Sequence, residues 1–249
     1  MPAATKYPDE AASRPAICEI GRRLYQRGLC CGNDGNTSVR IGDDRVLATP
    51  TMICKGFMQP DDLCVIDLAG NQISGARRRT SEIFLHLEIY AGDANARAVV
   101  HSHPPHATAF AIARVDIPSG VVPEAELFLG AVPRAAYETP GNKNFAATVR
   151  PFVGKSNAVV LSSHGTVSWA AELEHAYWYT EMLDNYCRML MLARSLGHVE
   201  RLPQDKVREL LALRPNFGMP PDEREAAASE RLFINREWGT KEQGNKETR

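Results

Sequence analysis

The sequence lacks the features that mark membrane, secreted and nucleic-acid-binding proteins. None of its 249 residues belongs to an apolar run of about 18 residues, and the N-terminus has no apolar core of a signal peptide. Its six cysteines form no C-x-x-C pair and are too scattered for a disulfide framework. A formal net charge of -1 gives no electrostatic basis for binding nucleic acid or an anionic membrane. We therefore expect a cytoplasmic protein with reduced thiols, and neither nucleic acid nor a membrane among its partners.

What is present is an ordinary globular composition, 44% hydrophobic, in a length that suits one α/β domain. Helical periodicity covers residues 9–29, 81–91, 105–113, 143–152, 172–196 and 203–213. Strand-like runs cover residues 37–41, 46–49, 64–68, 97–101, 157–161 and 166–169, with weaker strand signals around 119–137. This pattern predicts an α/β/α sandwich around one mixed sheet. We expect a single domain over residues 1–230 and a polar tail over 231–249.

Three histidines lie in two short motifs, each at the end of an apolar, strand-like run. The motifs are H-S-H at residues 101–103 and S-H-G at residues 163–165. Successive side chains of a strand point to opposite faces, so His101 and His103 can face one ion while the serine between them faces away. Three protein ligands with one open position are typical of catalytic zinc. The motifs therefore predict a metal site made by His101, His103 and His164.

These histidines belong to a longer series of motifs that occur in one order along the chain. The series is G-N-T-S at 35–38, T-P-T at 49–51, T-S-E at 80–82, H-S-H at 101–103 and H-G at 164–165. Over roughly residues 12–200 the chain thereby resembles the class II aldolase/adducin family, whose best-known enzymes are fuculose-1-phosphate and rhamnulose-1-phosphate aldolases. The resemblance implies a mainly antiparallel sheet within the sandwich.

The resemblance also implies an activity. A family aldolase binds one Zn²⁺ per subunit and cleaves or condenses a small ketose 1-phosphate, giving dihydroxyacetone phosphate and an aldehyde through a metal-stabilised enediolate. It implies Glu82 as the catalytic residue, because a carboxylate beside zinc can bind the ion and also exchange protons. A first-turn glutamate favoured by the helix dipole fits the same position. The family further implies a homotetramer with active sites at subunit interfaces.

Four residues are carried over from the family motifs as binding residues for a sugar-phosphate substrate. They are Asn36, Thr51, Thr80 and Ser81. Their amide and hydroxyl groups can donate to phosphate oxygens, and backbone N–H groups at the helix start near residue 81 add a site for an anion. Lys55 can supply a positive charge.

The chain departs from the aldolase pattern at two places. The glycine that often follows T-P-T is Met52 here, which removes the close backbone approach that glycine allows. The tyrosine that fuculose-type aldolases place between the two histidine motifs is missing, and an ungapped comparison puts Val122 there.

Between the two histidine motifs the chain has glutamates in place of that tyrosine. Glu126 with Gly130 resembles the methylthioribulose-1-phosphate dehydratase branch of the family, in which a glutamate of this region is the acid/base. Glu126 is therefore a second candidate catalytic residue, with Glu124 beside it, although both also fit a solvated strand edge. Three alternatives to the aldolase stay open: a dehydratase that uses Glu126, a decarboxylase on the same scaffold, and a non-catalytic adducin-like interaction domain.

Overall fold

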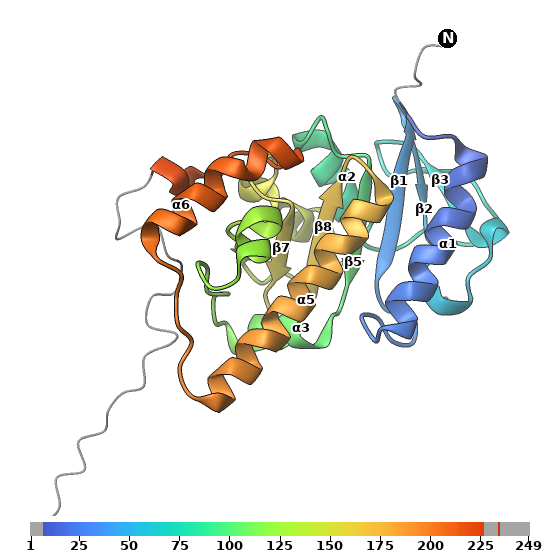
Figure 1. Ribbon diagram of the computed structural model, residues 1–249. Coiled ribbons are helices and arrows are strands. Elements are labelled where there is room, and N and C mark those ends of the chain that lie inside the picture. The colour runs from blue at the N-terminus through green and yellow to red at the C-terminus, as the bar shows by residue number, and fades with distance from the viewer. Residues whose placement is uncertain (1–6, 227–233, 235–249) are drawn as a thin grey trace, which may run out of the picture.

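The computed structural model describes residues 7–226 and Ile234, and the strands of this part form one eight-stranded sheet (Figure 1). The strands are β1 (Asn36–Gly42), β2 (Arg45–Ala48), β3 (Cys64–Ile66), β4 (Gln72–Ser74), β5 (Ala98–Ser102), β6 (Arg134–Ala135), β7 (Ala158–Leu161) and β8 (Gly165–Ala170). Their order in the sheet is β4-β3-β2-β1-β5-β8-β7-β6. All neighbours are antiparallel except β6 and β7, which run parallel. The expected mixed, mainly antiparallel sheet is confirmed.

Six α-helices accompany the sheet in the described part of the chain. They are α1 (Glu10–Gln26), α2 (Ile83–Gly92), α3 (Pro105–Ala113), α4 (Lys143–Ala147), α5 (Leu173–Leu196) and α6 (Gln204–Leu213). Single helical turns are η1 (Lys55–Phe57), η2 (Pro60–Asp62), η3 (Ala125–Leu129, π-helical), η4 (Arg150–Phe152), η5 (Arg214–Phe217) and η6 (Glu223–Ala226). None of the described helices is long and apolar enough to cross a membrane.

Side chains of each strand alternate between the two faces of the sheet, and each face packs against its own helices. On β2, Val46 and Ala48 join the apolar cluster of α2 and α4, whereas Leu47 joins the cluster of α1. On β7, Val159 packs with α2 and α4, while Val160 packs with α3 and α5. The sheet therefore lies between two helical layers, with α1, α3 and α5 together on one face (Figure 1). This is the expected α/β/α sandwich.

Strand register brings distant motifs of the sequence to one place in the middle of the sheet. Asn36 at the start of β1 pairs with His101 near the end of β5. Ser102, at the end of β5, pairs with Thr166 at the start of β8. The turn that holds His164 directly precedes β8, so the two histidine motifs and the G-N-T-S motif meet at this point.

One expectation is wrong over residues 119–137, where strand signals were weak. This segment is loop and the π-helical turn η3, apart from the two-residue strand β6. Apolar side chains such as Leu129 pack against α5, so they are buried by a turn and not by a sheet face. The alternation of apolar residues therefore did not indicate a strand here.

Two further boundaries differ. The helix expected over residues 143–152 is the short α4 followed by the separate turn η4, because Pro151 has no N–H to donate within a continuous α-helix. The edge strand β4 was not predicted, since all three of its side chains are exposed and show no apolar alternation. Apart from Ile234, the predicted tail over 231–249 lies outside the described residues.

Candidate active site

The three histidines of the two motifs come together in one cluster. His101 lies within β5 and is 0% exposed, His103 follows that strand, and His164 lies in the turn between β7 and β8. Their candidate ligand nitrogens all lie within 4.8 Å of one another. The ring centroids of each pair are 4.8 to 5.0 Å apart. The structure therefore brings together the three residues that the sequence predicts as metal ligands.

Two glycines of the motifs allow this close approach of backbone segments. A Cβ atom on Gly165 would lie 2.5 Å from the carbonyl oxygen of Ser102 and 2.6 Å from Cδ2 of His103. A Cβ atom on Gly35 would lie 2.9 Å from the carbonyl oxygen of His101, and Gly35 has a φ of +69°. Such contacts exclude any larger residue without movement of the backbone. The glycines of G-N-T-S and H-G thus set how closely their loops pack on the H-S-H segment.

A hydrogen bond made by His101 and a close carboxylate beside His103 orient these two imidazole rings toward the centre of the cluster. Nδ1 of His101 lies 2.8 Å from the carbonyl oxygen of Thr166, which can only accept, so this nitrogen donates and Nε2 is the atom that faces the cluster. Nδ1 of His103 lies 3.3 Å from Oδ2 of Asp34, which leaves its Nε2 3.2 Å from Nε2 of His101. Burial and the neighbouring His101 lower the pKa of His164 to about 4, so the third ring is neutral. Three ring nitrogens that face one another at these distances can each present a lone pair to one shared cation.

Glu82 completes the cluster from the start of α2, where it is the N-cap residue. Its Oε2 lies 3.2 Å from Nε2 of His101, and its Oε1 lies 3.4 Å from Nε2 of His164. Burial opposes ionisation, but the facing His101 and His164 and a hydrogen bond from Asn36 outweigh it and hold the pKa of Glu82 well below its usual range. Oε1 is buried and has no hydrogen-bond partner among the described residues. Three imidazoles and one carboxylate form a donor set that fits a divalent ion such as Zn²⁺.

The structure gives Asn36 two partners inside the protein. Its Nδ2 donates to Oε2 of Glu82 at 2.7 Å, and its Oδ1 lies 2.5 Å from Nε2 of His86. Asn36 is 4% exposed, so its amide faces the carboxylate and not solvent. Its predicted role in phosphate binding stays a prediction, and its observed contacts are with Glu82 and His86.

The other predicted phosphate residues lie on two adjacent segments beside Glu82. The N–H of Thr51 donates to the carbonyl of Arg78 at 2.9 Å, and the N–H of Thr80 donates to the carbonyl of Thr49 at 3.2 Å. Oγ1 of Thr80 accepts the N–H of Glu82 at 3.3 Å, which places that hydroxyl at the helix start. The T-P-T and T-S-E motifs therefore lie side by side in the fold, and Ser81 is exposed there.

Two residues that follow the T-P-T motif, Met52 and Lys55, differ from what the sequence alone suggests for a phosphate-binding loop. Met52 has a φ of +56°, so the loop keeps the left-handed backbone that a glycine would favour, at a cost in strain. Lys55 is 3% exposed and donates to the carbonyls of Asn33 and Ile53 at 3.1 and 2.8 Å. Burial lowers the pKa of Lys55. Its ammonium group is engaged in holding two loops together.

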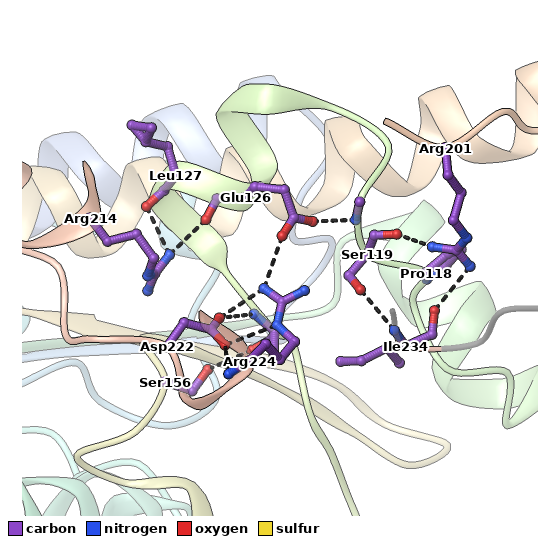
Figure 2. A network of polar contacts seen from close by, with 12 residues as sticks. Pro118, Ser119, Glu126, Leu127, Ser156, Arg201, Arg214, Asp222, Arg224 and Ile234 are labelled. Carbon is purple, nitrogen blue, oxygen red and sulfur yellow. Dashed lines mark hydrogen bonds and ion pairs between the residues drawn. The ribbon is translucent and has the colours of Figure 1, made fainter. Parts of the chain in front are cut away.

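Glu126, the second predicted catalytic residue, lies in the π-helical turn η3 and is 1% exposed (Figure 2). Oε1 accepts the N–H of Gly120, and Oε2 lies 2.9 Å from Nη2 of Arg224. Arg214 donates to the backbone carbonyls of Glu126 and Leu127 at 2.9 and 2.8 Å. The two arginines come from the C-terminal part of the chain (Figure 2), and none of the three histidines is among these partners of Glu126. Glu126 is not on a solvated strand edge, so that interpretation is wrong.

Sequence reasoning missed two residues that contact the cluster. Oδ2 of Asp34 lies 3.3 Å from Nδ1 of His103, and Oδ1 of Asp34 accepts the N–H of Cys31 at 2.6 Å. The carbonyl of Thr166 orients His101. The available signal was Asp34 itself, a carboxylate in the glycine-flanked loop 32–35, because histidines that bind a metal commonly donate their other N–H to a carboxylate.

Fold and site together define an α/β protein with one mixed sheet, in which three histidines at the ends of central strands meet a glutamate at the start of α2. The family model described as the class II aldolase and adducin N-terminal domain matches residues 15–191 of the chain. The match covers more than half of the sequence and all of the site residues described above except Arg214 and Arg224. The chain belongs to the class II aldolase/adducin family.

Relatives within the family have different named activities. The chain is 33% identical over 208 residues to the 3-oxo-tetronate 4-phosphate decarboxylase of Cupriavidus necator, which covers 81% of this chain and 95% of the relative. It is 35% identical over 173 residues to the L-fuculose phosphate aldolase of Methanococcus vannielii, covering 70% of this chain and 91% of the relative. Among solved structures it is similar to YgbL of Klebsiella pneumoniae, for which aldolase, epimerase and decarboxylase are alternatives. That similarity has a TM-score of 0.75 and 30% identity, over 82% of this chain and 99% of the other.

Proposed function

We propose that the chain is a metal-dependent carbon–carbon lyase whose reaction passes through the enediolate of dihydroxyacetone phosphate, and that it acts as an aldolase on a small ketose 1-phosphate. The observation that carries the proposal is the carboxylate of Glu82. It lies against Nε2 of His101 and of His164, and its buried Oε1 has no hydrogen-bond partner in the described part of the chain. A buried carboxylate oxygen in this state is costly unless a cation or a proton meets it.

The donor set supports a metal site at the centre of the cluster. His101, His103 and His164 would hold one divalent ion per subunit, with Glu82 beside it, and imidazole ligands with a carboxylate favour Zn²⁺. When bound, such an ion supplies Lewis acidity toward carbonyl and hydroxyl oxygens of the substrate.

Glu82 is the residue for proton transfer. In aldol cleavage the bond between C3 and C4 of the ketose 1-phosphate breaks. Glu82 takes the proton of the 4-hydroxyl group as the aldehyde forms, while the electron pair of the broken bond stays on C3 as the enediolate. Glu82 then returns a proton to C3, which completes dihydroxyacetone phosphate.

The phosphate would be held by hydroxyl and backbone donors of the two adjacent motifs. Ser81 is exposed, and Thr51 lies on the neighbouring segment. Both are close in the chain or in space to the start of α2, where free backbone N–H groups and the helix dipole favour an anion. No charge from Lys55 is required, since its ammonium group is engaged within the loops.

A decarboxylase is the second candidate, favoured by the relative that aligns over 208 residues. In a 3-oxo-tetronate 4-phosphate the carboxylate lies two carbons from the oxo carbon. Loss of CO₂ breaks the C1–C2 bond and leaves its electron pair on C2, as an enediolate of the same dihydroxyacetone phosphate. Glu82, after taking a proton from solvent, would deliver it to C2. Both candidates therefore share the step in which Glu82 protonates the enediolate.

A dehydratase that uses Glu126 has less support. That carboxylate is buried against Arg224 and the N–H of Gly120, and both contacts belong to the same chain. An adducin-like interaction domain has no chemical need for Glu82 beside three histidines. We therefore rank the dehydratase and the interaction domain below the two carbon–carbon lyase reactions, aldol cleavage and decarboxylation.

A homotetramer with active sites at subunit interfaces belongs to the same proposal. Glu82 is a single acid–base group, and a second subunit could add a residue that reaches the far oxygen of the substrate. Light scattering at micromolar protein should report about four times the chain mass of 27.5 kDa. A monomer that is fully active at nanomolar concentration would exclude a shared site.

A substrate panel tests the proposal. Purified protein would be incubated with ketose 1-phosphates that differ in chain length and stereochemistry, and separately with 3-oxo-tetronate 4-phosphate. Release of dihydroxyacetone phosphate would be followed by a coupled assay, with and without a chelator. We expect chelator-sensitive release from at least one substrate. Failure of all substrates with metal-loaded protein would overturn both lyase reactions.

A further inference from the structure

Behind Glu82 lies a row of buried polar side chains whose contacts with one another are not required for metal binding. Glu82, His86 and Tyr90 recur every four residues, so they lie on one side of α2. Asn36 and Ser38 are two residues apart on β1, so they point to the same face of the sheet. The two series face each other where α2 packs on the sheet.

The side chains of this row form a continuous chain of hydrogen bonds that ends on Glu82. Oγ of Ser38 lies 2.7 Å from the hydroxyl of Tyr90 and 2.7 Å from Nδ1 of His86. Nε2 of His86 lies 2.5 Å from Oδ1 of Asn36, and Nδ2 of Asn36 lies 2.7 Å from Oε2 of Glu82. We call these five residues the Glu82–Tyr90 chain.

The direction of every hydrogen bond in the Glu82–Tyr90 chain follows from the carboxylate of Glu82 at one end. An ionised carboxylate only accepts, so Asn36 must present its NH₂ group to Glu82 and its oxygen to His86. That oxygen only accepts, so Nε2 of His86 carries the hydrogen. Burial lowers the pKa of His86 to about 3, so the ring is neutral and Nδ1 accepts from Ser38. Tyr90 then donates to Ser38 at 2.7 Å, the shorter of its two contacts, the other being the carbonyl of Arg97 at 3.5 Å.

The polar row costs stability that its position in the fold does not require. His86 and Ser38 are 0% exposed, and Tyr90 is 3% exposed within the apolar cluster that includes Leu85 and Ile89. Apolar side chains would fill this space without the need to satisfy each donor and acceptor. A complete chain of this kind specifies one arrangement of its members, because any rotated amide or alternative imidazole tautomer leaves a buried group without a partner.

We propose that His86 is a positioning residue, which acts through Asn36 to hold Glu82 so that Oε2 is hydrogen-bonded and Oε1 faces the histidines. This rests on the proposed role of Glu82. With His86 as the donor, Asn36 cannot turn its oxygen toward Glu82. The carboxylate is thereby kept in one rotamer although its Oε1 has no hydrogen-bond partner among the residues described. Ser38 and Tyr90 fix the tautomer of His86.

Two substitutions at position 86 test the proposal through kinetics. His86→Leu removes the donor to Asn36, and we expect kcat to fall roughly 10-fold to 100-fold with KM changed less than about threefold, as is common when an outer residue that orients a ligand is lost. His86→Gln keeps a donor and an acceptor on a neutral side chain, and should restore most of kcat. Metal content by elemental analysis should be unchanged in both variants.

Matched controls separate positioning from loss of core packing. Tyr90→Phe removes only the terminal hydroxyl of the Glu82–Tyr90 chain, and Tyr186→Phe removes a buried hydroxyl that donates to the carbonyl of Pro118 instead. We expect a lower kcat for Tyr90→Phe and an unchanged kcat for Tyr186→Phe. Ser38→Ala and Ser168→Ala form a second pair, since Ser168 is a buried serine that bonds to Ala176 and Thr180.

An NMR measurement reads the same arrangement without any turnover. In wild-type protein loaded with Zn²⁺, imidazole ¹⁵N shifts of His86 should show the neutral tautomer with hydrogen on Nε2. A hydrogen on Nδ1 would overturn the proposal, whether or not His86→Leu folds. Equal kcat in wild type, Tyr90→Phe and Ser38→Ala would also overturn it. If no lyase substrate is found but the predicted tautomer of His86 is observed, the proposed function fails, while the hydrogen-bond arrangement of the Glu82–Tyr90 chain stands.

Discussion

Two buried glutamates of this protein have opposite surroundings. Glu82 lies against His101 and His164, and its Oε1 has no hydrogen-bond partner among the described side and main chains. Glu126 is 1% exposed, and its Oε1 accepts the N–H of Gly120. Its Oε2, which also has no hydrogen bond among the described residues, forms an ion pair with the guanidinium of Arg224 at 2.9 Å. Both residues were candidate catalytic acids in the sequence. The difference indicates that Glu82 is arranged for an ion or a proton, and that Glu126 is arranged to hold the chain together.

The contacts around Glu126 join the turn η3 to the C-terminal segment of the described chain. Arg224 also lies 2.8 Å from Oδ2 of Asp222, and the N–H of Ala131 donates to that same oxygen at 3.1 Å. These contacts join the C-terminal turn η6 to both ends of η3 (Figure 2). Burying charged groups is costly unless they are paired, so each partner depends on the others.

The largest expected effect on catalysis is at Glu82. Glu82→Gln keeps the shape of the side chain and removes the charge and the proton-transfer group. We expect kcat to fall by roughly 10² or more, with the unfolding midpoint nearly unchanged. Steady-state kinetics on the substrate found in the panel, with thermal unfolding of the same samples, gives both values. Near wild-type turnover would show that the base lies elsewhere.

Glu126→Gln should show the reverse pattern. The change leaves Arg224 buried with less charge compensation, and loss of one partner of a buried pair costs about 3–5 kcal/mol of unfolding free energy. Urea unfolding measures this loss, and kcat of the folded fraction should stay within about threefold of wild type. The double variant Glu126→Gln/Arg224→Met removes both charges and should recover part of the stability. A large fall in kcat with unchanged stability would return Glu126 to the candidate catalytic residues.

A smaller effect is expected where Asp34 orients His103. Asp34→Asn keeps a similar shape but weakens the acceptor for Nδ1, which should lower metal affinity roughly 10-fold to 100-fold. Competition with a zinc chelator measures this change on folded protein. Asp67→Asn is the matched control, since Asp67 caps a surface turn through Asn71. Equal affinity in both variants would remove Asp34 from the metal centre.

The smallest of these effects concerns substrate binding. Ser81→Asp adds a negative charge at the exposed start of α2, where we place the phosphate. We expect KM to rise about 10-fold, since like charges disfavour an anion at a helix start, while metal content stays unchanged. Initial rates over a range of substrate concentrations measure KM. A neutral, non-phosphorylated substrate that reacts equally well would show that this surface reads another group.

The parts of the site that could be predicted are those encoded in short motifs. The ends of apolar, strand-like runs predicted His101, His103 and His164 as metal ligands. The T-S-E motif predicted Glu82 as the catalytic residue. The sheet, its two helical layers and the long α5 followed from apolar periodicity. These signals work because the periodicity of buried side chains is local in sequence.

The remainder depends on contacts between distant segments. Asp34 reaches His103 only because β1 pairs with β5, and His86 finds Asn36 only because α2 packs on that part of the sheet. Nothing in the local sequence distinguishes His86 from an ordinary core histidine. Glu126 shows the opposite problem, since a motif indicated catalysis while its partner Arg224 lies far along the chain.

The central claim, that Glu82 protonates an enediolate, can be tested without knowing the natural substrate. Dihydroxyacetone phosphate would be incubated in D₂O with zinc-loaded protein, and loss of one proton signal at C3 would be followed by ¹H NMR. We predict exchange of one hydrogen by the wild type, stopped by a chelator and slowed roughly 10² or more by Glu82→Gln. Exchange by Glu82→Gln at the wild-type rate, or no exchange by wild type above the protein-free rate, would contradict the account.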